Sequence, residues 1–251
     1  MLPVRKIENY VKNETKNIES VVHDFSHLKR AAISAKWFVK ILNGSKRDQD
    51  LAYISGLLHD IVRPASEKID HAKASAEKSQ KILEKFKFKE RDKKRIIEAI
   101  ESHREKQEWK DALHQSVFLA DKILEQMGAF IIFRRSMYVG ECEDYADKEP
   151  LKSIMEQFRK KLKKFTILEF PKKFRKLVRY QYKWSFNFLR ALENNEKWAI
   201  EMALFGYEAG VKKENIIKAI KKFRPRLIEQ KNIYQETISY LKKKNLVNLK
   251  N

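Results

Sequence analysis

Residues 57–64 read LLHDIVRP and set a histidine beside an aspartate at the end of an apolar segment. The residues before this pair are apolar on most sides of a helix, so we expect a central, buried helix over residues 50–61. Pro64 ends it, because proline cannot continue a helix in its interior. His59 and Asp60 therefore lie at the end of a core helix, where polar groups without a partner cost free energy.

Two more polar residues occupy similar positions. His27 lies in the first turn of a predicted helix over residues 26–42, and Asp121 lies inside the apolar stretch 117–124. A shared divalent cation would satisfy all of these groups at once. Imidazole and carboxylate ligands suit Mn, Fe, Co, Ni or Mg, and they leave room for water in an octahedral shell. The predicted metal ligands are His27, His59, Asp60 and Asp121.

The order of these residues resembles the HD-domain phosphohydrolase superfamily, in which a His, a His-Asp pair and a distant Asp lie on successive helices. The local text is similar to a subgroup of small HD hydrolases. The resemblance extends over roughly residues 20–195 and departs at Val62, where the family has Gly. The similar stretches are residues 23–27 (HDFSH), 57–64 (LLHDIVRP), 71–76 (HAKASA), 100–103 (IESH) and 120–123 (ADKI), the last followed by Gly128 and Ala129.

The resemblance implies an all-α fold, an HD-domain helical bundle. It also implies hydrolysis of phosphate esters or anhydrides, often of nucleotides, by attack of a metal-activated water. The expected substrate is a small phosphorylated molecule, most plausibly a nucleotide, and the expected cofactor is a divalent ion (Mn, Mg, Co, Ni or Fe), as one ion or two.

Four residues are predicted to act beside the metal ligands. Three roles stay open for His71 and His103. They are phosphate contacts or proton donors, or they are ligands of a second metal ion, or they are ordinary polar surface residues. Arg63 follows Asp60 by three residues, so it either clamps phosphate or only stabilises the end of the helix. Lys122 is adjacent to Asp121 and is a candidate for substrate contact.

The rest of the chain also reads as helical. Only 6 Gly and 5 Pro occur in 251 residues, which favours long helices over a sandwich or a barrel. We expect one long helix over about residues 111–139, and basic helices over about 151–165, 171–195, 196–209, 213–223 and 226–245. The predicted domains are a metal-dependent hydrolase domain over residues 1–195 and a basic helical extension over residues 196–251.

The positive charge is unevenly distributed. Residues 1–150 hold 29 Lys/Arg and 25 Asp/Glu, whereas residues 151–251 hold 26 and 9, so the second part carries +17 of the net +21. Such a field favours polyanions, although Lys-rich solvated helices explain it equally well. Residues 174–184 interleave aromatic and basic side chains, which either stack on nucleotides or pack inward as an amphipathic helix. Two alternatives therefore stay open, a nuclease or phosphodiesterase on nucleic acid and a non-catalytic nucleic-acid-binding protein.

The cellular compartment of the protein can also be predicted. A single cysteine, Cys142, excludes a disulfide within the chain and argues against a Cys-based zinc site. The first residues lack the apolar stretch of a signal peptide, and no run of about 18 apolar residues exists, so we expect no membrane span and a cytoplasmic protein. Formation of a homo-oligomer is an alternative use of the basic extension.

Overall fold

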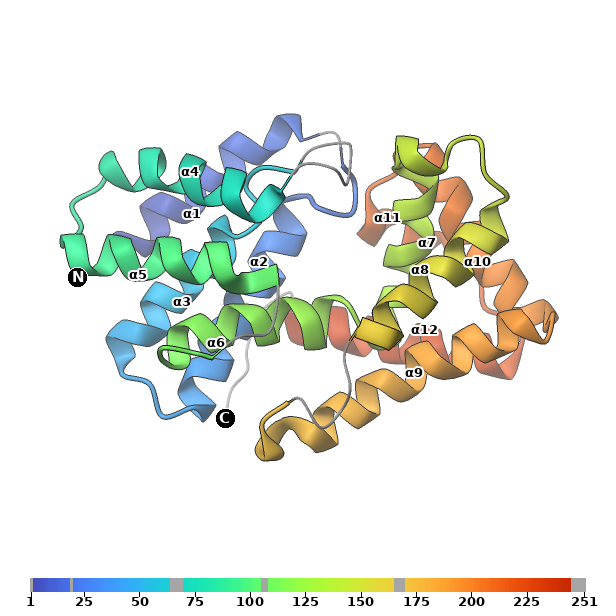
Figure 1. Cartoon of the computed structure of the whole chain (residues 1–251). Helices are drawn as coiled ribbons and strands as arrows, with labels where there is room; N and C mark the ends of the chain where they lie inside the picture. Colours follow the sequence, from blue (N-terminus) through green and yellow to red (C-terminus); the bar gives the residue numbers. More distant parts are fainter. Residues whose placement is uncertain (1, 19, 64–69, 105–107, 165–169, 245–251) are drawn as a thin grey trace. The chain divides into compact units, whose positions relative to one another are not determined.

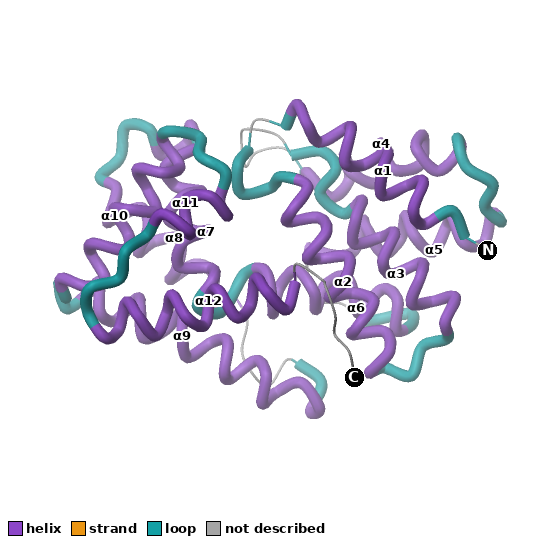
Figure 2. Tube along the Cα trace, turned by 180° about the vertical axis from the view of Figure 1, so that it is seen from behind, coloured by secondary structure: helices purple, strands orange, loops and turns teal. Residues whose placement is uncertain are grey.

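The structure is a computed structural model that describes residues 2–18, 20–63, 70–104, 108–164 and 170–244. All regular elements in these ranges are helices, which confirms the predicted all-α class (Figure 2). The chain divides into two compact units, unit 1 (Met1–Leu124) and unit 2 (Glu125–Asn251). No helix in the described ranges combines the length and the apolar character that a membrane span requires.

Unit 1 is built around a central helix, α3. Every residue of α3 from Leu51 to Leu58 is buried, as expected for a helix that is apolar on most sides. Its neighbours α1, α2, α5 and α6 pack around it (Figure 1). The helices of unit 1 are α1 (Val4–Glu14), α2 (Phe25–Ile41), α3 (Lys46–Leu58), α4 (His71–Glu84), α5 (Glu90–Glu101) and α6 (Ala112–Leu119).

Local signals set the boundary between α2 and α3. Asn43 adopts a left-handed conformation with φ 60° and donates to Lys40 O, while Gly44 donates to Val39 O, which together end α2 in a Schellman motif. Ser45 and Asp48 then form a reciprocal capping box at the start of α3. The short connection makes α2 and α3 antiparallel neighbours.

Gly56 lets α2 and α3 approach each other closely. A Cβ atom at this position would lie 2.5 Å from Ala32 Cα and 2.8 Å from Ala32 N. Only a residue without a side chain fits such a crossing, so Gly56 sets the distance between the helix that starts near His27 and the helix that ends at His59.

The prediction of one long helix over residues 111–139 was wrong. The structure has α6, then a π-helical segment over Ala120–Glu125, a bend at residues 126–129, and α7 (Phe130–Glu141). Gly128 explains the break, because its φ of 97° is a backbone conformation that L side chains rarely adopt. A Cβ at Gly128 would also meet the Gln181 side chain.

Unit 2 is a second all-helical body. Its helices are α7, α8 (Pro150–Lys164), α9 (Arg175–Glu193), α10 (Lys197–Val211), α11 (Ile216–Lys222) and α12 (Ile228–Lys244). Helix α10 packs against α7, α8 and α9, so the residues on both sides of position 195 share this unit. The division into a hydrolase domain over 1–195 and an extension over 196–251 remains a prediction about function.

Candidate metal centre

The first two predicted ligands come from the neighbouring ends of α2 and α3. His27 is the third residue of α2, and its backbone N–H donates to the N-cap Asp24. His59 follows the last residue of α3. Both side chains are fully buried, and their ring centroids lie 5.0 Å apart. The close α2–α3 crossing at Gly56 therefore brings together two histidines that are 32 positions apart in the sequence.

Hydrogen bonds fix the tautomers of two buried histidines. His59 Nδ1 lies 2.8 Å from Gly56 O, and His103 Nδ1 lies 2.5 Å from Ile100 O. A carbonyl oxygen only accepts, so each Nδ1 carries a proton, and in the neutral ring each Nε2 has the lone pair. Neither Nε2 has a hydrogen-bond partner among the described residues. Both atoms are therefore available as metal ligands.

Asp60 lies between two pairs of histidines. Its Oδ2 is 3.5 Å from His27 Nε2 and 3.6 Å from His59 Nε2. Its Oδ1 is 3.5 Å from His71 Nε2 and 3.6 Å from His103 Nε2. One carboxylate thus faces four imidazoles, two with each oxygen.

Asp121 completes the cluster from the π-helical segment. Potential ligand atoms of His27, His59 and Asp121 all lie within 4.8 Å of one another. The same holds for His59, Asp60 and His103. The structure therefore brings together all four predicted ligands, and it adds His103 to the groups that could hold an ion.

The Lys122 side chain is directed toward Asp121, the predicted ligand that precedes it. Its Nζ donates to Asp121 Oδ2 at 2.6 Å, and both side chains are almost fully buried. In a regular α-helix, consecutive side chains diverge by about 100°. Asp121 and Lys122 lie in a π-helical segment instead, and both side chains point inward and form an ion pair.

His71 and Arg63 lie at the edge of the cluster. Each side chain is about a fifth exposed, with 18% for His71 and 19% for Arg63. Arg63 Nη1 lies 3.8 Å from Asp60 Oδ2. Val62, the residue before Arg63, is tied to α4, because Ser75 Oγ accepts from Val62 N and donates to Val62 O, both at 3.2 Å.

The electrostatics favour neutral imidazoles beside ionised carboxylates. Burial lowers the pKa of His59 to about 4, against the opposing attraction of Asp60. Burial also lowers the pKa of His71 to about 3. Burial alone would raise the pKa of Asp121, but the nearby Lys122 and the histidines His59 and His103 together outweigh burial and keep that pKa well below the usual value. At neutral pH the site therefore presents lone pairs and negative charge.

These features fit a divalent cation. The lone pairs of His59 Nε2 and His103 Nε2 face the oxygens of Asp60 at 3.6 Å without an intervening hydrogen bond. Electron-rich atoms so close together in a buried site repel each other unless a cation lies among them. Histidine and aspartate are also the ligand types that such ions prefer.

Comparison with protein families agrees with this geometry. Residues 24–125 match the family described as "HD domain". The protein carries an HD domain. The match spans all four predicted metal ligands and confirms the resemblance drawn from the sequence. An HD domain implies a metal-dependent phosphohydrolase that uses a divalent metal.

Solved structures share the fold of this HD-domain protein. Bacillus subtilis YpgQ in complex with ADP is 17% identical, with a TM-score of 0.55 over 78% of this chain and 99% of that chain. A second structure of YpgQ is 19% identical, with a TM-score of 0.56 over 78% and 96%. A Lactobacillus plantarum protein is 19% identical, with a TM-score of 0.57 over 76% and 95%. No curated protein matches the chain.

Some residues that build the HD-domain site were missed in the sequence. The carbonyl groups of Gly56 and Ile100 orient His59 and His103, each from three residues earlier. No side-chain pattern marks a backbone carbonyl. Ser75 belongs to a stretch that the family resemblance includes, but its two bonds to Val62 depend on a loop path that sequence does not reveal.

The remaining histidines lie outside the cluster of ligands. His114 contacts Asp111 Oδ1 at 2.7 Å and Glu98 Oε2 at 3.3 Å, so it holds α6 to α5. His23 contacts Ser20 Oγ at 2.9 Å, and its ring packs edge-on against that of His27. It therefore packs against a predicted ligand and comes from the loop before α2.

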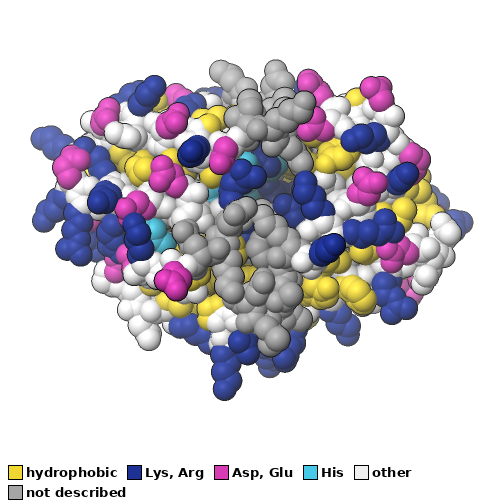
Figure 3. All heavy atoms as spheres, viewed as in Figure 1, with side chains coloured by type: hydrophobic (Ala, Val, Ile, Leu, Met, Phe, Trp, Pro, Cys, Tyr) yellow, Lys and Arg dark blue, Asp and Glu magenta, His cyan; other side chains and the backbone are white. Residues whose placement is uncertain are grey.

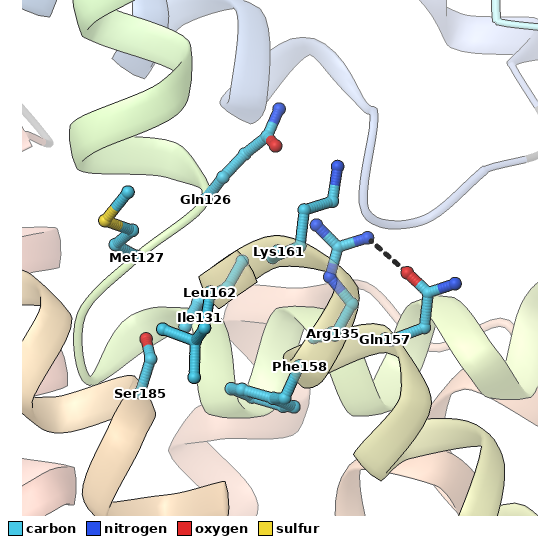
Figure 4. Close-up of a pocket in the computed structure, with 9 residues that line it drawn as sticks. All are labelled: Gln126, Met127, Ile131, Arg135, Gln157, Phe158, Lys161, Leu162 and Ser185. Atoms are coloured by element: carbon cyan, nitrogen blue, oxygen red, sulfur yellow. Dashed lines mark hydrogen bonds between the residues drawn. The ribbon is translucent and has the colours of Figure 1, made fainter. Parts of the chain in front are cut away.

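Unit 2 contains a small pocket of a different chemical kind (Figure 4). Arg135 lies in it and donates to Gln157 Oε1 at 3.3 Å. Its other lining residues include Phe158, Leu162 and Ser185, and none of the lining residues is a histidine or a carboxylate. This pocket therefore lacks the ligands of the metal centre.

Proposed function

We propose that the protein hydrolyses a phosphate anhydride or ester of a small phosphorylated substrate, namely a nucleotide. The observation that carries this proposal is the buried cluster in which Asp60 faces four imidazoles while Asp121 lies against two of them. A bound divalent ion would supply an activated water and Lewis-acid polarisation of the phosphoryl group. The ADP complex of the similarly folded YpgQ supports a nucleotide as the substrate.

The residues around the ligands would handle the charge of the substrate. Arg63 is partly exposed at the edge of the site, and its planar guanidinium suits two phosphate oxygens at once. His71 is the partly exposed histidine of the cluster, so it is the one that a substrate can reach. Lys122 is bonded to Asp121, which supports a role in holding that carboxylate as well as in attracting the substrate.

We further propose that His103 is a ligand rather than a phosphate contact. It is fully buried, and its Nε2 lies within 4.8 Å of the potential ligand atoms of His59 and Asp60. The separation of the four histidines into two pairs, one at each Asp60 oxygen, is compatible with a second ion held by His71 and His103. Mn, Mg, Co, Ni and Fe all accept this ligand set, so the ion must be identified by experiment.

The test is hydrolysis of nucleoside triphosphates, diphosphates, monophosphates and short oligonucleotides with Mn, Mg, Co or Ni added. Asp121→Asn removes a ligand charge with little change of shape, and we expect at least about a 100-fold loss of kcat. Asp50→Asn is the matched control, because Asp50 pairs with Lys36 on the surface of unit 1 and should leave kcat unchanged.

The product identifies the bond that is broken. Pyrophosphate or phosphate from a nucleotide would support the proposal, whereas shortened strands alone would favour the nuclease. Absence of turnover in a folded, metal-loaded protein would overturn it and favour a non-catalytic binding protein. Full activity of Asp121→Asn would instead overturn the assignment of the metal centre to this cluster.

A further inference from the structure

Helix α9 of unit 2 has a solvent-facing side whose composition is unusual. One side of the helix is buried, with Val178, Ser185 and Phe188 among the core residues. From residue 172 to residue 190 the chain has seven Lys/Arg and no Asp/Glu. The basic residues therefore gather on the side that faces the solvent, rather than being distributed among acidic ones.

The exposed centre of α9 is a stripe of unpaired cations. Lys176, Arg179, Lys183 and Arg190 follow one another at intervals of three, four and seven residues, so they share one face of the helix. None of the four has an ion-pair partner in the described part of the chain. The acid at the end of α9, Glu193, is already bound to Arg159 of α8 at 2.8 Å.

Aromatic pairs lie on both sides of this stripe. Tyr182 and Phe186 are stacked, with ring centroids 5.9 Å apart and an interplanar angle of 18°. Tyr180 and Trp184 meet edge to face at 6.3 Å. Tyr180 is 46% exposed and Phe186 is 39% exposed. Figure 3 shows hydrophobic and basic side chains beside each other over the region of α9.

The two aromatic pairs differ in their contacts with the rest of unit 2. Burial and a hydrogen bond with Glu236 of α12 raise the pKa of Tyr180, so the Tyr180–Trp184 edge already touches a neighbouring helix and an acid. The Tyr182–Phe186 edge is the one that presents an aromatic face beside free cations.

This arrangement distinguishes between possible partners. A helix that lies on a membrane places its apolar side chains at the centre of the exposed face and its cations at the edges. Helix α9 has the opposite order, with cations at the centre and aromatic rings at the edges. A single-stranded nucleic acid needs that order, because its phosphates follow a basic track while its unpaired bases stack on aromatic rings.

We propose that the solvent face of α9 binds single-stranded nucleic acid. The phosphates lie along Lys176, Arg179, Lys183 and Arg190, and a base stacks against Phe186 beside Tyr182. The interaction needs no metal and does not depend on the hydrolase activity.

The test is fluorescence anisotropy of the full chain with a labelled single-stranded oligonucleotide of about 20 nucleotides. EDTA prevents metal-dependent cleavage, so a failure of the hydrolase proposal does not affect the result. The double variant Arg179→Ala/Lys183→Ala should weaken binding at least tenfold at about 50 mM salt. It should also reduce the slope of log K against log salt by about 1.4, since two phosphate contacts are removed.

A matched control removes the same charge elsewhere in unit 2. Lys218→Ala/Lys231→Ala deletes two exposed cations of α11 and α12 and should change the affinity less than twofold. An equal loss in this control would overturn the proposal, because net charge rather than the α9 face would then determine binding.

A second pair of variants tests stacking. Phe186→Ala should weaken single-strand binding about tenfold without changing the salt slope, and Phe186→Tyr should restore it. A duplex of equal length should not respond to Phe186→Ala. The proposal fails if the wild-type chain does not bind the oligonucleotide. It also fails if vesicles of phosphatidylserine and phosphatidylcholine bind more tightly and alone respond to Phe186→Ala.

Discussion

At the scale of single residues, the metal centre depends on where each proton is held. Gly56 O and Ile100 O accept hydrogen bonds from the Nδ1–H groups of His59 and His103, which leaves both Nε2 atoms directed at Asp60. The backbone therefore performs the role that carboxylates play beside many metal-bound histidines. A ligand oriented by a carbonyl has a fixed tautomer without adding charge to the site.

The buried, neutral His59 makes folding depend on pH. Its folded pKa of about 4 lies below the value of 6.5 for a free histidine. Between these values the unfolded chain binds more protons than the folded one, so stability falls as the pH is lowered from about 6.5 toward 4. We expect His59 alone to remove about 2 kcal/mol from the free energy of unfolding between pH 7 and pH 5.

Urea unfolding at both pH values, in EDTA, measures this effect. The variant His59→Asn lacks the titrating group, so its stability should change less with pH by about that amount. Parallel curves for the wild type and the variant would show that His59 does not titrate as predicted.

At the scale of helices, the α2–α3 crossing connects stability with metal binding. Gly56→Ala would place a Cβ 2.5 Å from Ala32 Cα, so the helices must separate. We expect the free energy of unfolding to fall by about 1–3 kcal/mol, as for other overpacked contacts. Because His27 and His59 lie on these two helices, Mn²⁺ affinity should also fall, by at least about tenfold.

Gly210→Ala provides the matched control. A Cβ there would meet Met137 O at 2.0 Å, so this change also crowds a helix crossing, between α10 and α7 in unit 2. Calorimetric titration with Mn²⁺ should give wild-type affinity for folded Gly210→Ala. Equal affinities of the two glycine variants would mean that the α2–α3 spacing does not position the ligands.

Much of the helical structure around the site could be predicted from the sequence. The expected helix over residues 26–42 corresponds to Phe25–Ile41, and the expected buried helix over residues 50–61 corresponds to the later part of α3. Both succeeded because apolar periodicity and clear stop signals agree there. The clustering of the four predicted ligands could also be expected, because buried His and Asp residues on apolar helices require a partner.

The failures have a physical cause. The apolar pattern continues through residues 111–139, so periodicity cannot reveal that Gly128 adopts a positive φ and breaks the helix. Periodicity also cannot detect the π-helical segment or the bond that Lys122 donates to Asp121 within it. Both features are backbone conformations that tertiary packing stabilises.

At the scale of the whole chain, metal binding should protect the two units unequally. Every predicted ligand precedes Glu125 and thus belongs to unit 1. Saturating Mn²⁺ at about 100 times its Kd stabilises the bound unit by up to about 2.7 kcal/mol, so its slowest amides should exchange up to about 100-fold more slowly. Amides of α10 and α11 should be unaffected.

Hydrogen–deuterium exchange with and without Mn²⁺ measures this difference. Asp121→Asn is the control, in which Mn²⁺ should no longer slow exchange around residues 57–62 and 100–104. Equal protection of α3 and α10 in the wild type would contradict the prediction, since it would mean that the chain opens as one cooperative body.

The π-helical segment over Ala120–Glu125 also limits how the sequence can change during evolution. Its hydrogen bonds span one more residue than those of an α-helix, so the segment contains a residue that a regular helix would not need. Loss of one residue after Asp121 would restore a regular helix and change which side chains after Asp121 face the site. Descendants of this protein can therefore vary the side chains here more safely than the length. Homologous chains without the π turn should align with it only after a gap of one residue is opened between positions 120 and 125.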